Sequence, residues 1–299
     1  MKVFTYQVLI VLSRWFGPWV FTLVSRFIAV GYFFLFPRRA AVSAKFYAAL
    51  FPGKGRLFHW YCAWRQYQNF TTVFMDRIRT SGQENIQFTS TGWQRFEDEL
   101  GKGHGAIVLM SHMGNWDVAA NLMAKQRKDI KLLLYMGAKA KEQIESVQKQ
   151  ELSDKGIRIV AVEPSAGSPL DVVDGIRFLK SGGVVSLTGD KLWHPDQRAV
   201  SVPFLGQTAR IPEFPHVFAL VSKAPLFVFF TFRTGPGSYR FMLSEPMYIS
   251  CASREDRTRA VAESARGYGE MLEQTLRDHP YEWYHFDPFL VDHPGQPLT

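Results

Sequence analysis

The segment AIVLMSHMGNWDVAANLM, residues 106–123, contains a histidine and an aspartate suited to acid–base chemistry, His112 and Asp117. An imidazole can remove a proton from an attacking hydroxyl, and a carboxylate bonded to its other nitrogen fixes the tautomer and stabilises the imidazolium. A hydroxyl activated in this way can attack an activated acyl carbonyl directly, without a Ser or Cys nucleophile. On one continuous helix, side chains with this spacing point about 140° apart and could not readily meet. The pair therefore requires a change of secondary structure between its members.

The flanking residues predict such a change. The apolar run at residues 106–110 predicts a buried strand, and residues 116–127 are compatible with a helix. Residues 111–115 would then lie at the carboxyl edge of a sheet, where open α/β folds bind ligands. Asp117 would lie in the first helical turn, where the helix dipole favours an anion.

Two residues of this turn, Gly114 and Asn115, are candidates for substrate binding. Gly114 allows a close approach of the backbone, and Asn115 can serve as the helix N-cap. We hypothesise that backbone amides around these two residues hydrogen-bond the oxyanion that develops at an attacked carbonyl.

Other motifs exclude several classes of protein. The glycines of GKGHG, residues 101–105, resemble a phosphate loop, but they precede a strand rather than follow one, which predicts a turn. The sequence contains no Walker A motif, no G-x-S-x-G nucleophile elbow and no H-E-x-x-H metal motif. These absences disfavour an NTPase, an α/β-hydrolase and a zinc peptidase.

Strand-like and helix-like segments alternate through the rest of the chain. The pattern predicts an α/β fold with a mostly parallel or mixed central sheet flanked by helices. An amphipathic helix is expected around Trp60–Ile78, and a late helix with a possible capping box at Ser253 and Asp256 is closed by Pro280. The other expected strands lie at 131–135, 157–162, 184–188 and 226–232, and the other expected helices at 140–154 and 169–181.

Basic charge is concentrated in the N-terminal part of the chain. Residues 1–80 contain eleven Lys and Arg but one acid, Asp76, whereas the remaining residues carry 24 basic and 26 acidic groups. The segment Trp15–Phe36 is strongly apolar and carries Arg26 as its one charge. Arg26 near its middle and Gly17-Pro18 near its start favour membrane association over spanning. We expect residues 1–37 to form an N-terminal membrane anchor and residues 38–299 to form the catalytic domain.

Two other interpretations of the N-terminus stay open. A cleaved signal peptide fits less well, because apolar and aromatic residues continue up to Phe36 and a small-residue cleavage site is lacking. A buried pair of helices is the second alternative. Because the basic residues flank an apolar segment, the anionic cytoplasmic leaflet of a membrane is a better binding partner for them than nucleic acid.

The catalytic segment resembles the H-x-x-x-x-D/E motif of the lysophospholipid acyltransferase superfamily. SHMGNWD is similar to the HxGNWE block of the bacterial lipid A late acyltransferases, which transfer lauroyl or myristoyl groups, and of their phosphatidylinositol mannoside relatives. IRFLKSGGVVSLTGDK looks like the family's helix, Gly-Gly turn and strand with a second acidic motif. VPFLGQTARIPEFPHVFALVSKAPLFVFF and HPYEWYHFDPF are similar to later blocks, so the resemblance runs from about Gly101 to Phe289.

This resemblance implies a glycerol-3-phosphate acyltransferase-like α/β fold and a set of site residues. His112 is the general base, Asp117 is its partner, and the family's second acidic position falls on Asp190. Asp190 could also be a simple turn carboxylate, since Gly-Asp is common in turns. Lys191 could bind a phosphate or remain solvated. The substrate-binding candidates are therefore Gly114, Asn115, Asp190 and Lys191.

Several positions depart from the family pattern. Asp117 stands where the most similar lipid A enzymes usually have Glu, and Phe214 replaces a glycine of the family's Pro-x-Gly-Pro. The Arg that those enzymes use between the two acidic blocks could correspond to Arg158 or to Arg177. These differences concern the acceptor more than the chemistry.

The resemblance implies a membrane-associated O-acyltransferase without a metal or redox cofactor. It would move a fatty acyl group from an acyl carrier protein thioester, or from a coenzyme A thioester, to a hydroxyl of a lipid or glycolipid. We expect it to act in lipid A or related envelope-lipid biosynthesis, at the bacterial inner membrane with its catalytic domain facing the cytoplasm. The alternatives are another lipid pathway, including N-acylation, a non-catalytic lipid-binding relative, and a hydrolase.

Overall fold

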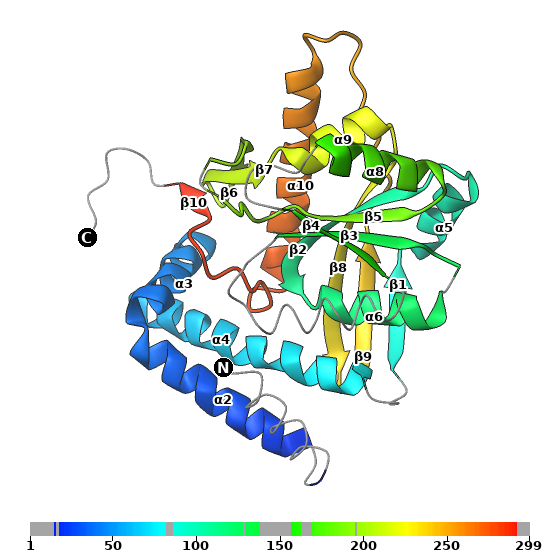
Figure 1. Cartoon of the computed structure of the whole chain (residues 1–299). Coiled ribbons are helices and arrows are strands. Elements are labelled where there is room, and N and C mark those ends of the chain that lie inside the picture. Colours follow the sequence, from blue (N-terminus) through cyan, green and yellow to red (C-terminus); the bar gives the residue numbers. More distant parts are fainter. Residues whose placement is uncertain are drawn as a thin grey trace.

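A seven-stranded, mostly parallel sheet forms the centre of the molecule in the computed structural model (Figure 1). The strand order is β1-β9-β8-β2-β5-β3-β4, and of these neighbouring pairs only β8 and β9 are antiparallel. The sheet therefore confirms the predicted α/β class. Its strands are β1 (Gln87–Thr91), β2 (Ala106–Gly114), β3 (Leu132–Gly137), β4 (Arg158–Val162), β5 (Val184–Thr188), β8 (Leu226–Gly235) and β9 (Ser238–Leu243). The structure describes residues 15, 18–81, 86–127, 129–137, 157–162, 169–194 and 196–291.

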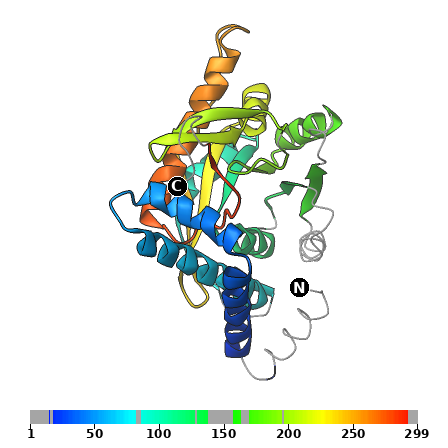
Figure 2. The ribbon, with the colours of Figure 1, turned by 90° about the vertical axis from the view of Figure 1, so that its left-hand side faces the viewer.

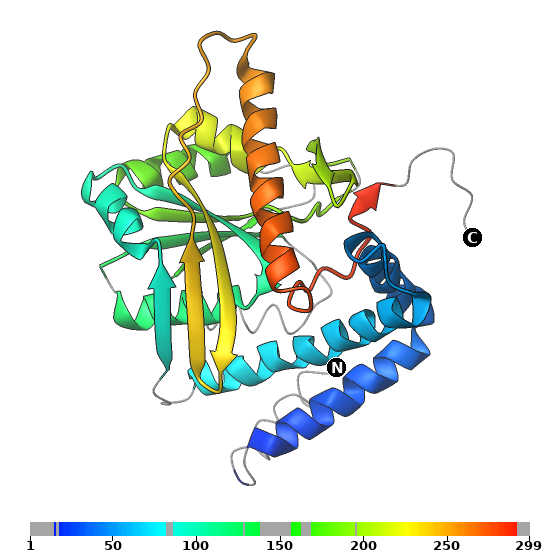
Figure 3. The same ribbon diagram turned by 180° about the vertical axis from the view of Figure 1, so that it is seen from behind.

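Helices cover both faces of this sheet, because the central strands are apolar on both sides. On β2, Ile107 and Leu109 pack into the core beneath three helices, while Ala106 and Val108 pack against two others. Figure 3 shows the long helix α10 crossing one face. The first group is α8 (Pro169–Lys180), α9 (Phe214–Ser222) and α10 (Arg257–Asp278), and the second is α5 (Trp93–Gly101) and α6 (Trp116–Gln126).

A small antiparallel sheet lies beside the main one. It has the order β10-β7-β6, with β6 at Ala199–Phe204, β7 at Gln207–Pro212 and β10 at Leu290–Val291. Helix α10 packs on β6, where a Cβ at Gly269 would lie 3.3 Å from Val202. This sheet fixes the end of the C-terminal segment that follows α10.

Three N-terminal helices pack together at one side of the molecule (Figures 1 and 2). They are α2 (Pro18–Leu35), α3 (Pro37–Leu50) and α4 (Arg56–Ser81). Pro37 begins α3, because proline lacks the amide hydrogen that would continue the preceding helix. Within the described residues no single helix is long and apolar enough to cross a membrane, whereas Trp19–Leu35 and Pro37–Leu50 together pass that test, with a bend of 91°. Membrane anchoring by residues 1–37 stays a prediction.

Most of the elements expected from the sequence are present. Strand β2 is longer than the predicted 106–110, and helices α6 and α8 match the predicted 116–127 and 169–181. GKGHG forms the expected turn before β2. The helix predicted at 140–154 lies outside the described residues.

The predicted start of the last helix was wrong. The N-cap of α10 is Asp256 rather than Ser253. The Ser253 hydroxyl instead accepts a hydrogen bond from the Asp256 amide in the turn before the helix. The Ser253 hydroxyl also donates to Asp256 Oδ2, so the two predicted residues are in contact, but the helix begins about one turn later than predicted.

Candidate active site

Two neighbouring parallel strands bring His112 and Asp190 together. Strands β2 and β5 pair in parallel with Met110 opposite Thr188, so His112 and Asp190 each lie two residues beyond this pair. Parallel strands present their carboxyl ends at the same edge of the sheet, where α/β folds place ligand sites. The sheet register alone therefore puts an imidazole next to a carboxylate.

Hydrogen bonds fix this pair. His112 Nδ1 lies 2.8 Å from Asp190 Oδ1, and the His112 backbone amide donates to Asp190 Oδ2 over 2.7 Å. The Asp190 side chain is fully buried, whereas the His112 side chain keeps 26% of its surface exposed. The carboxylate is thus held inside the protein while the imidazole reaches the surface of the site.

The Asp190 carboxylate determines the tautomer of His112. Burial by itself raises the pKa of Asp190, but the adjacent His112, together with His285 and the Trp283 indole, holds this pKa well below its usual range. An ionised carboxylate only accepts hydrogen bonds, so Nδ1 of the neutral imidazole carries the proton. Nε2, which has no hydrogen-bond partner among the described residues, is then the basic nitrogen. The arrangement can remove a proton and stabilise the resulting imidazolium.

Asp117, the partner predicted for His112, lies buried in the first turn of α6. Its backbone carbonyl accepts a hydrogen bond of 2.8 Å from the Asn121 side chain. In this structure the carboxylate bonded to His112 Nδ1 is that of Asp190 and not that of Asp117. Whether the Asp117 carboxylate contributes to catalysis stays a prediction.

Gly114 and Asn115 position the turn, but their amides are already engaged. The Gly114 amide donates to the carbonyl of Glu282 over 2.7 Å, and the Asn115 amide donates to the carbonyl of Thr231 over 2.9 Å. In this structure neither amide is available to an oxyanion, which is a correction to the hypothesis from the sequence. Gly114 has a φ of 71°, and a Cβ there would lie 1.8 Å from the Thr231 oxygen, so the close approach is one to strand β8 rather than to a ligand.

The side chain of Asn115 does not cap α6, although Asn115 occupies the N-cap position. Its Nδ2 donates to the Val73 carbonyl of α4 over 3.5 Å. The sequence identified the boundary of the helix correctly, and the side chain ties the turn to α4 instead of to the helix amides.

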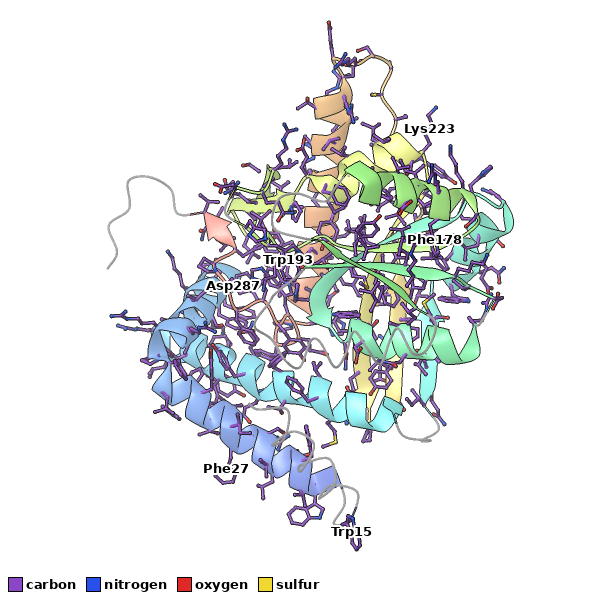
Figure 4. All side chains as sticks on the ribbon, viewed as in Figure 1. Trp15, Phe27, Phe178, Trp193, Lys223 and Asp287 are labelled. Carbon is purple, nitrogen blue, oxygen red and sulfur yellow. The ribbon has the colours of Figure 1, made fainter. Side chains whose placement is uncertain are left out.

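Lys191 follows Asp190 and is paired within the protein. Its Nζ lies 2.9 Å from Asp287 Oδ2 and 5.4 Å from the ring centre of Trp193. Trp193 also lies near His112, with 6.3 Å between ring centres. Figure 4 labels Trp193 and Asp287. Binding of substrate by Lys191 stays a prediction.

Two site residues, Trp283 and His285, were missed in the sequence. The Trp283 indole donates to Asp190 Oδ2 over 2.7 Å, and the His285 ring centre lies 6.1 Å from that of His112. Burial lowers the pKa of His285 to about 4, so this ring is neutral at pH 7. Both belong to the block HPYEWYHFDPF, whose dense aromatic and histidine content was the available signal.

Other candidates lie in exposed or purely apolar surroundings. Arg158 and Arg177 both lie near Asp174, at 3.7 and 3.8 Å, and both side chains are more than half exposed. Phe214 packs on Tyr135 and on Phe218 of its own helix. The Phe214 departure from the family pattern is therefore accommodated by packing against the sheet. Among the described residues, no group of three or more His, Cys, Asp or Glu is placed to hold a metal ion.

A histidine base with a buried carboxylate, at the carboxyl edge of a mostly parallel sheet, defines the class of α/β protein that can activate a hydroxyl. The model of the bacterial lipid A biosynthesis acyltransferase family matches residues 64–290, well over half of the chain. The chain therefore belongs to this family, and the family implies an acyltransferase. The match contains His112, Asp190 and Trp283 but not α2 or α3. A search of curated proteins gives no match.

Proposed function

We propose that the protein transfers a fatty acyl group from a thioester donor to a hydroxyl of a lipid or glycolipid acceptor. His112 Nε2 takes the proton of the hydroxyl as its oxygen attacks the thioester carbonyl. The tetrahedral intermediate then collapses, the carbon–sulfur bond breaks, and the imidazolium returns the proton to the departing thiolate. The acceptor belongs to lipid A or related envelope-lipid biosynthesis. An acyl carrier protein supplies the donor, with coenzyme A as the alternative, and the proposed steps use no metal or redox cofactor.

The observation that carries this proposal is the hydrogen bond between His112 Nδ1 and Asp190. It leaves the second imidazole nitrogen unprotonated at a partly exposed position, as a general base requires. Membership of the acyltransferase family supports an acyl group as the group that is transferred.

A narrow apolar crevice with a free volume of about 30 Å³ lies between the sheet and helices α5 and α6, and a long acyl chain would enter it only if the side chains around it moved apart. It includes Met110, two positions before His112 on β2, and continues to Trp93 and Phe96 of α5. A fatty acyl chain suits such a lining, because burial of each methylene is favourable by about 0.8 kcal/mol. The crevice is lined by Trp93, Phe96, Val108, Met110, Trp116, Ala119, Ala120, Met123, Leu132, Leu134, Val184, Ser186, Phe229 and Leu243.

A second, polar cavity begins at Asp190 and suits an anionic part of a substrate. Lys191, Arg210 and His285 contribute to its wall, together with the C-terminal segment Asp287–Val291. Asp287 balances Lys191, which leaves Arg210 as the more available cation for a phosphate. We place the phosphate of the donor or of the acceptor here.

The outer side of α2 supports association with a membrane. Phe21 and Phe33 are buried against α4, at 1% and 8% exposure, and the opposite side of the helix is exposed. This α2 face holds Trp19, Leu23, Phe27 and Phe34, of which Phe27 and Phe34 are 68% and 69% exposed. Figure 4 shows Phe27 and Trp15 projecting away from the body of the molecule. Large exposed apolar patches mark sites of membrane or protein contact.

Charge next to the α2 face selects an anionic bilayer as the partner. The one acid in residues 1–80, Asp76, is buried and pairs with Arg233, so the exposed surface there is basic. Basic side chains near a bilayer are attracted to anionic lipids by about 1 kcal/mol each. We place the protein at the cytoplasmic surface of the bacterial inner membrane, with the α2 face in the lipid. Among the N-terminal residues whose burial the structure describes, the exposed cations are Arg26, Arg38, Arg39, Lys45, Lys54, Arg56 and Arg65.

Product analysis tests the reaction. Purified protein is incubated with an acyl carrier protein thioester and a lipid extract, and the products are identified by mass spectrometry. The proposal predicts a lipid heavier by one acyl group and one equivalent of free thiol. Free fatty acid without an acylated lipid would identify a hydrolase, and binding of lipid without turnover would identify a non-catalytic relative.

A further inference from the structure

The C-terminal segment after α10 lies directly against the catalytic turn. The Gly114 amide donates to the Glu282 carbonyl over 2.7 Å, and the Tyr284 amide donates to the His112 carbonyl over 2.8 Å. Met113 and Trp283 form an antiparallel bridge between these bonds. Figures 1 and 3 show this segment passing from the end of α10 towards α3. The backbone from His112 to Gly114 is therefore held by residues far away in the sequence.

Trp283 adds a side-chain bond to this backbone pairing. Its indole Nε1 donates to Asp190 Oδ2 over 2.7 Å, and the same oxygen accepts the His112 amide. The other oxygen, Oδ1, bonds to the His112 imidazole. Because both oxygens are held, the carboxylate cannot rotate away from the ring without losing hydrogen bonds inside the protein.

The Trp283 ring is itself immobilised by packing. The residue is 1% exposed, and its ring centre lies 4.9 Å from that of Phe46 and 4.8 Å from that of Phe289. The Gln66 side chain donates to its carbonyl over 2.6 Å. The N–H, the one polar atom of the indole, is directed at Asp190, so packing on α3 and the small sheet determines where the carboxylate lies.

We infer that Trp283 is a positioning residue that holds Asp190 in line with His112. It sets the rate of proton transfer without touching the substrate. This inference rests on the proposed function, since it needs His112 to act as the base. A tryptophan that served only to pack the core would need its ring but not its N–H. A variant that keeps an aromatic ring and lacks the N–H therefore distinguishes the two roles.

The test compares Trp283→Phe, which keeps an aromatic ring and deletes the N–H, with a matched control, Trp64→Phe, in the aromatic contact of α4 with α2. We expect kcat to fall roughly 10- to 100-fold in Trp283→Phe, which is the range observed when a residue that orients an active-site group from behind is removed. The KM values for donor and acceptor should stay within about twofold of wild type, because no substrate contact is lost. The control should keep the wild-type kcat.

Two further readouts separate positioning from folding. A carboxylate that has lost one donor attracts the imidazolium proton more strongly, so the acid limb of the pH–kcat profile should move to higher pH in Trp283→Phe. In an Asp190→Asn background, Trp283→Phe should cost much less than in wild type, since the two residues act as one unit. If Trp283→Phe fails to fold, benzothienylalanine at position 283 replaces the N–H by sulfur in a ring of the same shape.

The outcomes distinguish this inference from the proposed function. An inactive wild-type protein would contradict the function itself. An active wild type whose N–H-deleted variants keep their kcat, or lose it equally with and without Asp190→Asn, would overturn the role of Trp283. A lower kcat with an unchanged acid limb would also overturn it, because that pattern follows from a loosened core.

Discussion

The catalytic edge of the sheet and the outer side of α2 differ in whether their side chains find partners within the protein. At the sheet edge Asp190 is fully buried and meets donors from β2 and from the C-terminal segment. On α2, Phe27 and Phe34 expose 68% and 69% of their surface. The first region is organised internally for chemistry, whereas the second presents apolar surface that suits a partner outside the chain.

The largest effect is expected at the sheet edge, from Asp190→Asn. This change leaves the shape of the site but reverses the hydrogen-bond requirement at His112 Nδ1, so we expect kcat to fall about 1,000-fold or more. Asp117→Asn should cost less, because Asp117 does not hold Nδ1 in the structure. Asp174→Asn, at an exposed ion pair, is the matched control. Steady-state kinetics measures kcat for each variant. A larger loss of kcat in Asp117→Asn than in Asp190→Asn would identify Asp117 as the functional partner of His112.

The elements that carry His112 and Asp190 could be predicted from the sequence, but the contact between the two side chains could not. The apolar runs predicted β2 and β5, and the family resemblance placed an acidic residue at Asp190. Nothing local indicates that these two strands are neighbours in the sheet, and this neighbourhood is what joins the two side chains. Long-range pairing of strands is set by the whole fold rather than by a motif.

Trp283 was less accessible to prediction than Asp190. It lies in an irregular segment, whose path depends on contacts with Gln66 of α4 and Phe46 of α3. Similarly, glycine at position 114 suggested space for a ligand, but strand β8 fills that space. Periodicity predicts which face of an element is buried, but it does not predict which irregular segment covers it.

A pH-dependent loss of stability should affect the interior near the site and leave the α2 face unaffected. Burial lowers the pKa of His216 to about 4, from 6.5 for an exposed histidine. Between these values the unfolded chain binds a proton that the folded protein excludes, so stability falls as the pH decreases through this window. From pH 7 to pH 5 we expect a loss of about 2 kcal/mol from this residue.

Thermal or denaturant unfolding of His216→Gln measures this contribution. The variant should lose less stability on acidification than wild type, and His104→Gln, in the exposed turn before β2, should behave as wild type. Binding to vesicles should not follow the titration of His216, since α2 carries no histidine. An equal acid sensitivity in wild type and His216→Gln would contradict the assignment.

The α2 face should determine membrane binding without affecting the chemistry. We expect Phe27→Glu combined with Phe34→Glu to weaken binding to phosphatidylglycerol vesicles about 10-fold or more, because two large apolar side chains lose their insertion. Flotation of vesicles measures the bound fraction. Val173→Glu on α8, which is also exposed, is the control.

Lipid composition provides a second test of the same face. Wild type should bind more weakly to neutral phosphatidylcholine vesicles and at high salt, because the adjacent cations then lose their attraction. Unchanged vesicle binding by the double variant would remove α2 from the interface. Self-association that disappears in that variant would instead identify a second copy of the chain as the partner.

The smallest effect is expected in the apolar crevice next to the site. Ala119 and Ala120 of α6 line it and are buried, so Ala120→Leu should shorten the space for an acyl chain. We expect the ratio of kcat/KM for long and short acyl donors to shift a few-fold towards the shorter chain. The ratio is measured within one variant, so a partial folding defect cancels. An unchanged ratio would place the chain elsewhere.

The central claim is that the imidazole of His112 is the base that activates the acceptor. The most direct measurement compares wild type, His112→Ala and His112→Gln for the rate of acyl transfer to extracted lipid, with circular dichroism to confirm folding. Our account predicts that both variants fold and that their rate of acyl transfer falls by about 1,000-fold or more relative to wild type. A folded His112→Ala protein that transfers the acyl group at the wild-type rate would contradict it.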